Sequence, residues 1–175
     1  FAGTVVAVGP GVTGLKVGSD VVGHVRAGAQ ATYLTVAAAR LVPKPRTMTF
    51  ETAGGLYLAG ATALDILDEL KIDPDDTVVI SAAAGGVGLI ACQWARALGV
   101  TMIGTVSTDE KAAAARANGC SHVIVTSRER IVDRVSAGED AGLDAVVLVH
   151  DRDVPFAELV RVKSALVTAG SRVRL

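Results

Sequence analysis

A glycine cluster lies between a predicted strand and a predicted helix in the middle of the chain. Residues 77–81 are typical of a buried strand, and residues 87–98 repeat apolar side chains at helical spacing. Between them, Gly86, Gly88 and Ala91 satisfy the spacing G-x-G-x-x-G/A. Glycine lets backbone N–H groups approach a pyrophosphate without a Cβ in the way, and a helix N-terminus favours the phosphate charge. The pattern predicts a dinucleotide-binding turn, with a tight turn that holds no ligand as the alternative.

Predicted strands and helices alternate through the rest of the chain. Apolar runs predict further strands over residues 101–106, 122–125, 144–149 and 172–175. Helical spacing predicts helices between them, over residues 109–118, 128–136 and 154–167. Such alternation forms βαβ units, which cover a parallel sheet with helices on both faces. We therefore expect a Rossmann-type α/β fold, in which Trp94 and Phe156 pack between helix and sheet.

The first 48 residues carry a different pattern. Valine-rich runs over residues 4–8, 21–25 and 33–36 are separated by glycines, which is typical of a β-meander. Residues 43–45, Pro-Lys-Pro, indicate a linker, and the apolar residues 56–67 predict a buried helix. The predicted domains are a partial β segment over residues 1–48 and a dinucleotide-binding domain over residues 49–175.

The end of the second strand of this alternating series bears on the choice of nucleotide. Enzymes that use NAD usually place an acid there for the ribose 2′-hydroxyl, but residues 104–108 contain none. Asp109 fits the first turn of the next helix instead. Lys111 lies one turn into that helix, where it can reach a 2′-phosphate, and Ser107 or Thr108 can add a hydroxyl hydrogen bond. The pattern favours NADPH over NADH, with a solvated surface lysine as the alternative for Lys111.

Composition excludes several classes of partner. The 17 basic and 18 acidic side chains nearly cancel, so no basic excess is present to hold a nucleic acid. Aromatic residues make up 3% of the chain, too few for base-stacking platforms. No apolar run reaches the roughly 18 residues of a membrane span. We therefore expect neither nucleic acid nor membrane as a partner.

The cysteines and histidines form no metal-binding pattern. Cys92 and Cys120 are far apart in the sequence, and the histidines His24, His122 and His150 are isolated. We expect no bound metal and two buried thiols in a reducing compartment. Because no signal peptide opens the chain, we expect a cytoplasmic location.

Segments spread over nearly the whole chain carry the pattern of a known family. They are residues 1–9, 15–18, 58–63, 83–88 and 104–107, together with Lys111. They resemble the quinone oxidoreductase branch of the medium-chain dehydrogenase/reductase superfamily, to which polyketide enoyl reductases are similar. The resemblance implies a partial GroES-like β segment that precedes a Rossmann domain, with the active site in the cleft between the two domains.

The resemblance also implies roles for individual residues. Thr62 would lie near the nicotinamide, and Ser107 and Lys111 at the 2′-phosphate. The pyrophosphate would lie on the loop formed by Ala84, Gly85, Gly86, Val87 and Gly88. The implied reaction is zinc-independent hydride transfer from NADPH to a quinone or an α,β-unsaturated carbonyl. No catalytic residue is assigned.

Some features depart from the family pattern. Phe1 begins in the middle of a strand, and the family's opening strands and closing strand are expected outside residues 1–175. Thr126 replaces a common tyrosine, and residues 150–153, His-Asp-Arg-Asp, replace a small turn. Residues 172–175 would form an open sheet edge, which predicts a homo-oligomer. The alternative to a reductase is a truncated, non-catalytic nucleotide-binding or interaction module.

Overall fold

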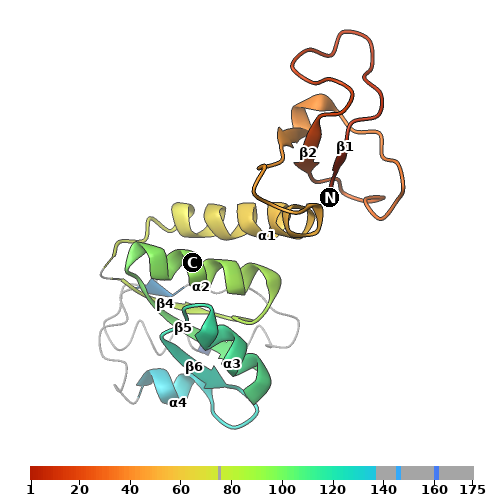
Figure 1. Cartoon of the computed structure of the whole chain (residues 1–175). Coiled ribbons are helices and arrows are strands. Elements are labelled where there is room, and N and C mark those ends of the chain that lie inside the picture. The colour runs from red at the N-terminus through yellow and green to blue at the C-terminus, as the bar shows by residue number, and fades with distance from the viewer. Residues whose placement is uncertain (75, 137–144, 147–159, 162–175) are drawn as a thin grey trace. The chain divides into compact units, whose positions relative to one another are not determined.

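The computed structural model describes residues 1–74, 76–136, 145–146 and 160–161. The chain divides into two compact units, Phe1–Ala61 and Thr62–Leu175. The division falls inside helix α1 (Phe50–Glu69), which is labelled in Figure 1. The predicted domain boundary between residues 48 and 49 stays a prediction.

The first unit contains a small antiparallel sheet. Its strands are β1 (Ala2–Thr4), β2 (Asp20–Gly23) and β3 (Leu41–Pro43), with β2 in the middle and the 3-10 helix η1 (Ala38–Arg40) before β3. Gly3 pairs with Val21 on one side of β2, and Val42 pairs with Val22 on the other. Val21 and Val22 are buried because they lie on the strand that has a neighbour on each side.

The predicted strand over residues 33–36 is wrong. This segment forms no strand, and Tyr33 is 75% exposed. A run of residues that favour β-structure forms a strand only where a neighbouring strand pairs with it, and among the described residues no strand pairs with residues 33–36. The strand predicted over residues 4–8 is also displaced, since β1 ends at Thr4.

Helix α1 confirms the helix predicted over residues 56–67. Thr49 supports its start, since the Thr49 hydroxyl accepts a hydrogen bond from the backbone N–H of Thr52 at 3.2 Å. The predicted burial holds for only one side of the helix. Ala63 and Leu67 are buried, whereas Leu58 is 58% exposed. No helix in the described part of the chain combines the length and apolar character that crossing a bilayer requires.

The second unit contains a parallel sheet. Its strands are β4 (Thr77–Ile80), β5 (Thr101–Val106), β6 (His122–Val125) and β7 (Ala145–Val146), in the order β6-β5-β4-β7. The chain runs outward from β4 to β5 and β6, whereas β7 pairs with the opposite side of β4. The carboxyl end of β4 is therefore a topological switch point, where open α/β sheets bind ligands.

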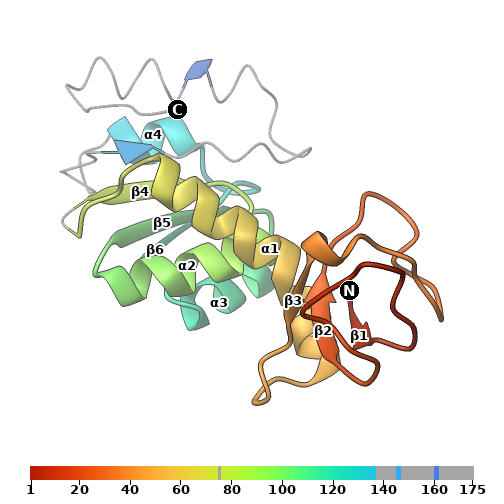
Figure 2. The ribbon, with the colours of Figure 1, turned by 90° about the horizontal axis from the view of Figure 1, so that it is seen from above.

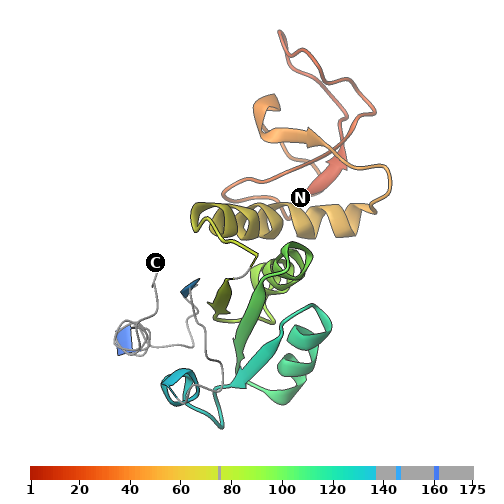
Figure 3. The same ribbon diagram turned by 90° about the vertical axis from the view of Figure 1, so that its left-hand side faces the viewer.

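Helices cover both faces of this sheet. Helices α2 (Gly86–Leu98) and α3 (Asp109–Ala117) lie on one face, and α4 (Ile131–Ser136) lies on the other, as Figures 2 and 3 show from two directions. The buried residues of α2 are Gly88, Ala91, Cys92 and Ala95, which recur at helical spacing. The predicted α/β fold with a parallel sheet between helices is confirmed.

Two local predictions fail in this unit. Trp94 was expected between helix and sheet but is 44% exposed, because it lies away from the buried side of α2. The helix expected from residue 128 begins only at Ile131. The predicted Phe156 contact, the helix over residues 154–167 (apart from the helical residues Val160 and Arg161), the turn at residues 150–153 and the edge at residues 172–175 lie outside the described residues.

We predict that Gly104→Ala destabilises the second unit. A Cβ at Gly104, in the centre of β5, would lie 2.5 Å from both the Ala83 Cβ and the Cys120 Sγ. Overpacking of this kind costs about 1–3 kcal/mol, which denaturant unfolding can measure. Gly55→Ala is the matched control, since a Cβ there meets nothing within 4 Å in α1 and should stabilise the helix by about 0.5–1 kcal/mol. Equal stabilities of the two variants would contradict this packing.

Candidate dinucleotide-binding site

The loop from β4 to α2 lies at the switch point of the sheet. It runs from Ser81 to the N-cap Gly85, and Figure 1 shows it joining β4 to the start of α2. Gly85 makes no side-chain hydrogen bond to cap the helix, and the first N–H groups of a helix have no acceptor within it. Gly85 and Gly86 are exposed. The positive end of α2 is therefore open to an anion.

Helix α2 lies very close to this loop. A Cβ at Gly88 would lie 2.4 Å from the Ala82 carbonyl oxygen and 2.8 Å from Ala83 backbone atoms, so only glycine fits. Ala91, one turn further, is also buried. Ala84 and Val87 are partly buried and pack against the core.

Ala82 holds the loop in an unusual conformation. Its φ of 52° lies in the left-handed region, which costs a non-glycine residue on the order of 1 kcal/mol. Hydrogen bonds fix this shape: the Gly85 N–H donates to the Ala82 carbonyl at 2.8 Å, and the Ala83 N–H donates to the Thr105 carbonyl at 3.1 Å. Strained backbone of this kind is common at ligand sites.

Ser81 brings a buried polar atom to the same place. It is 4% exposed, and within the described residues its Oγ has no hydrogen-bond partner. An unsatisfied buried hydroxyl costs about 1–3 kcal/mol. The hydroxyl therefore fits a site whose hydrogen-bonding partner belongs to a bound polar molecule.

The end of β5 carries the residues predicted to contact the ribose side of a nucleotide. The Lys111 Nζ donates a hydrogen bond to the Ser107 Oγ at 2.9 Å. The Thr108 hydroxyl caps α3, since it accepts from the Lys111 backbone N–H at 3.3 Å. Among the described residues, no carboxylate pairs with the exposed Lys111 ammonium. The structure thus brings these three residues together.

An arginine that the sequence did not single out also lies here. The Arg128 guanidinium, in the loop after β6, forms an ion pair with the Asp109 carboxylate in the first turn of α3. The sequence places Arg128 just after the strand predicted over residues 122–125, at the start of a predicted helix. It gives no strand order, so it does not indicate that Arg128 lies near the end of β5.

Thr62, the residue predicted to lie near the nicotinamide, comes from a different element, helix α1. It lies in α1, one residue before Ala63, and Ala63 belongs to the buried cluster that also contains Ala83. Thr62 is half-buried and in the same unit as the loop. Its role beside a nicotinamide stays a prediction.

The two cysteines lie together in the core as free thiols. The neighbouring Cys92 thiol and burial raise the pKa of the Cys120 thiol well above its ordinary value. Cys120 is therefore protonated at neutral pH and is no nucleophile. In the described part of the chain, no group of three or more His, Cys, Asp or Glu side chains could hold a metal ion.

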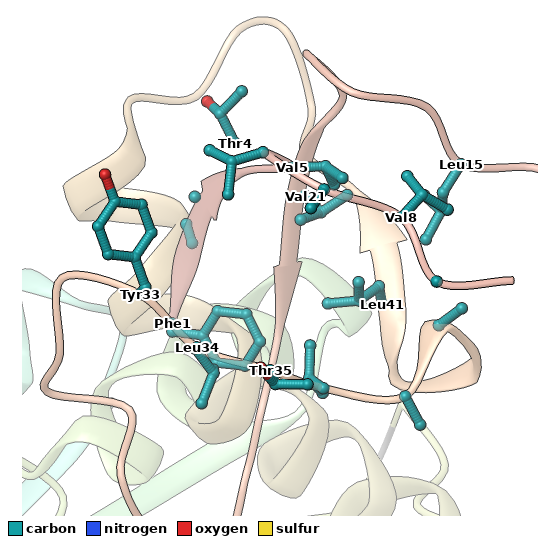
Figure 4. Close-up of a pocket in the computed structure, with 18 of the residues that line it drawn as sticks. Phe1, Thr4, Val5, Val8, Leu15, Val21, Tyr33, Leu34, Thr35 and Leu41 are labelled. Carbon is teal, nitrogen blue, oxygen red and sulfur yellow. The ribbon is translucent and has the colours of Figure 1, made fainter. Parts of the chain in front are cut away.

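A hollow of about 680 Å³ lies in the first unit, and the residues that line it lie between Phe1 and Leu41. Figure 4 shows it with apolar side chains such as Val5, Leu34 and Leu41 around it. No acidic, basic or histidine side chain lines it. Its lining is mainly apolar, and the hydroxyl groups in it come from Tyr33 and from Thr4, Thr32 and Thr35.

Comparisons with known proteins agree with this geometry. Residues 86–155 match the family model described as zinc-binding dehydrogenase. The quinone oxidoreductase of Salmonella typhimurium (strain LT2) is 41% identical over 152 residues, which cover 86% of this chain and 46% of that protein. The 2-haloacrylate reductase of Burkholderia sp is 41% identical, with 83% of this chain and 45% of that protein covered. The chain thus spans less than half the length of these curated relatives.

A solved structure shows the same fold. The crystal structure of Escherichia coli quinone oxidoreductase complexed with NADPH matches with a TM-score of 0.82 and 38% identity, over 91% of this chain and 49% of that one. A parallel sheet with a glycine loop at its switch point defines a Rossmann-type fold. Over the matched residues the chain is similar to the quinone oxidoreductase branch of the medium-chain dehydrogenase/reductase superfamily. The family resemblance predicted from the sequence is confirmed.

We predict that Ser81→Ala stabilises the chain without nucleotide but weakens nucleotide binding. Removing an unsatisfied buried hydroxyl should raise the free energy of unfolding by about 1 kcal/mol. Ser121→Ala is the control, because the Ser121 Oγ accepts a hydrogen bond from the Met102 N–H at 3.4 Å and its loss should lower stability. Thermal unfolding with and without nucleotide measures both effects. A Ser81→Ala variant that is less stable than the native chain would contradict the assignment of Ser81.

We predict that both thiols are protected in the folded chain. They should react slowly with a thiol reagent below pH 9 in the native state and rapidly in denaturant, since both are buried. Because the folded-state pKa of Cys120 is raised, stability from this group is fully present below the unfolded pKa of about 8.5. It declines as the pH rises above that value. Fast labelling of the native chain would show that the core packing is wrong.

Proposed function

We propose that the chain binds NADPH along the carboxyl edge of its parallel sheet and that the protein transfers hydride to a quinone or an α,β-unsaturated carbonyl. The observation that carries the proposal is the open, uncapped N-terminus of α2 at the switch point. The pyrophosphate would lie on the loop from Ala84 to Gly88, where exposed glycines allow close approach. The names of the relatives, quinone oxidoreductase and 2-haloacrylate reductase, support the class of substrate.

The residues at the end of β5 favour NADPH over NADH as the bound nucleotide. A 2′-phosphate is an anion, and residues 104–108 carry no carboxylate that would repel it. Lys111 adds a positive charge whose position is fixed by its hydrogen bond to Ser107. The N-terminus of α3, beginning at Asp109, adds its partial positive charge at the same place. NADPH complexes of related quinone oxidoreductases are consistent with this assignment.

The residues of this chain would bind and orient, and the bound nucleotide would supply the hydride. Reduction of an electron-poor double bond depends on the position of donor and acceptor and on a hydrogen bond to the acceptor carbonyl. Thr62 is the residue proposed to lie at the nicotinamide. The buried Cys120 thiol, which its raised pKa keeps protonated, takes no part.

We also propose that the substrate is a small molecule and that the protein is located in the cytoplasm. Association of two copies through residues 172–175 stays a prediction, because these residues lie outside the described ones. A non-catalytic nucleotide-binding module is the second candidate, because the described residues of the site are suited to bind and orient a nucleotide and none of them is assigned a catalytic role.

We predict that the chain binds NADPH more tightly than NADH and that Lys111→Ala reduces this preference. Loss of one charged hydrogen bond should weaken NADPH binding about 10- to 100-fold and leave NADH binding nearly unchanged. Calorimetric titration of the 175-residue chain measures both affinities. Lys16→Ala is the control, since Lys16 is an exposed lysine in the first unit. Equal affinities for the two nucleotides in the native chain would contradict the NADPH assignment.

The same preparation separates the two candidate functions. Oxidation of NADPH in the presence of a benzoquinone or an enone would support the reductase. Tight NADPH binding without turnover of any such acceptor would favour the non-catalytic module. Absence of binding of either nucleotide would overturn both candidates.

A further inference from the structure

We propose that Arg128 is a specificity-determining residue that selects NADPH, acting together with Asp109. The inference rests on the proposed function, because it concerns the same nucleotide site. Its basis is the ion pair between the Arg128 guanidinium and the Asp109 carboxylate, which joins the loop after β6 to the first turn of α3. Arg128 would contact the 2′-phosphate and would also neutralise the carboxylate nearest to it.

Backbone contacts hold Arg128 beside the end of β5. The Thr126 N–H and the Thr126 hydroxyl both donate to the Val106 carbonyl, at 2.8 and 3.1 Å. The Arg128 N–H donates to the Val125 carbonyl at 2.9 Å. Val106 immediately precedes Ser107, so the loop that carries Arg128 is fastened next to the Ser107–Lys111 pair.

The charges at this place require a second cation. The first turn of α3 carries two carboxylates, Asp109 and Glu110, whereas Lys111 supplies only one positive charge. A phosphate monoester adds a charge of about −1.5 to −2 near neutral pH. Lys111 alone would leave a strong excess of negative charge, which would oppose the phosphate. Arg128 offsets Asp109 and so makes the site suitable for an anion.

The Arg128 side chain is suited to release Asp109 and to bind a phosphate in its place. It is 60% exposed and Asp109 is 71% exposed, so their pair is weak and water-accessible. A guanidinium can bind two phosphate oxygens at once, a geometry that a lysine ammonium does not offer. Arg128 can therefore turn from the carboxylate to a phosphate at small cost. Without a 2′-phosphate the guanidinium stays on Asp109, which keeps this carboxylate from the ribose hydroxyl of NADH.

The experiment compares NADPH and NADH affinities of Arg128 and Asp109 variants of the whole chain. Arg128→Ala should weaken NADPH binding about tenfold or more while NADH binding stays constant or improves. Asp109→Asn added to Arg128→Ala should recover part of the NADPH affinity, because the unpaired carboxylate is then gone. Arg128→Lys should be intermediate. The loss should shrink as ionic strength rises, since exposed charges are screened.

Arg130→Ala is the matched control. Arg130 lies two residues away, is exposed, and faces Asp133 at 3.8 Å within the neighbouring segment rather than the end of β5. Its removal should leave both affinities unchanged. A purely structural role of Arg128 would lower both affinities together, and Asp109→Asn would not restore either.

The outcomes separate this inference from the proposed function. Preference for NADPH that depends on Lys111 but not on Arg128 would overturn the inference and leave the proposed function standing. Failure of the native chain to bind NADPH would overturn both. A selective loss of NADPH affinity in Arg128→Ala, relieved by Asp109→Asn, would establish the role of Arg128.

Discussion

The contact between Gly88 and the Ala82 carbonyl determines how close α2 can come to the end of β4. A side chain at residue 88 would occupy the space of the loop backbone, so the helix would have to move away. With glycine there, Ala91, Cys92 and Ala95 reach the core and the N-terminus of α2 opens at the switch point of the sheet. The packing of α2 and the position of its N-terminus thus both depend on the absence of a Cβ at residue 88.

Small side chains extend this close packing across the sheet. Gly104 on β5 leaves space for the Ala83 Cβ and the Cys120 sulfur. This brings the glycine loop, the central strand and the start of β6 into one buried cluster. Interiors packed at this density transmit a shift at one residue to its neighbours. The strained Ala82 and the unsatisfied Ser81 hydroxyl can persist because this surrounding cluster holds them in place.

The sequence predicted the parallel sheet well and the surface contacts poorly. The bounds of β5 and β6 agree with their predicted ranges, since strands buried on both faces are continuous apolar runs. Residues 33–36 have a similar composition but no partner strand, which local pattern does not reveal. The Arg128–Asp109 pair joins residues 19 positions apart, and it exists only because β6 lies beside β5. Ion pairs between residues that the order of strands brings together can therefore be identified only once the fold is known.

Cofactor choice in such a site cannot come from the glycine loop. NADH and NADPH share the pyrophosphate, so contacts with Gly85 and Gly86 contribute equally to the affinity of both. A difference in affinity requires groups that interact differently with a ribose hydroxyl and a ribose phosphate. In the described residues, the charged groups joined to the end of β5 are Asp109, Glu110, Lys111 and Arg128. Because α3 follows β5 and the loop that carries Arg128 follows β6, the proposed choice of nucleotide depends on the pairing of β5 with β6 as well as on the residues themselves.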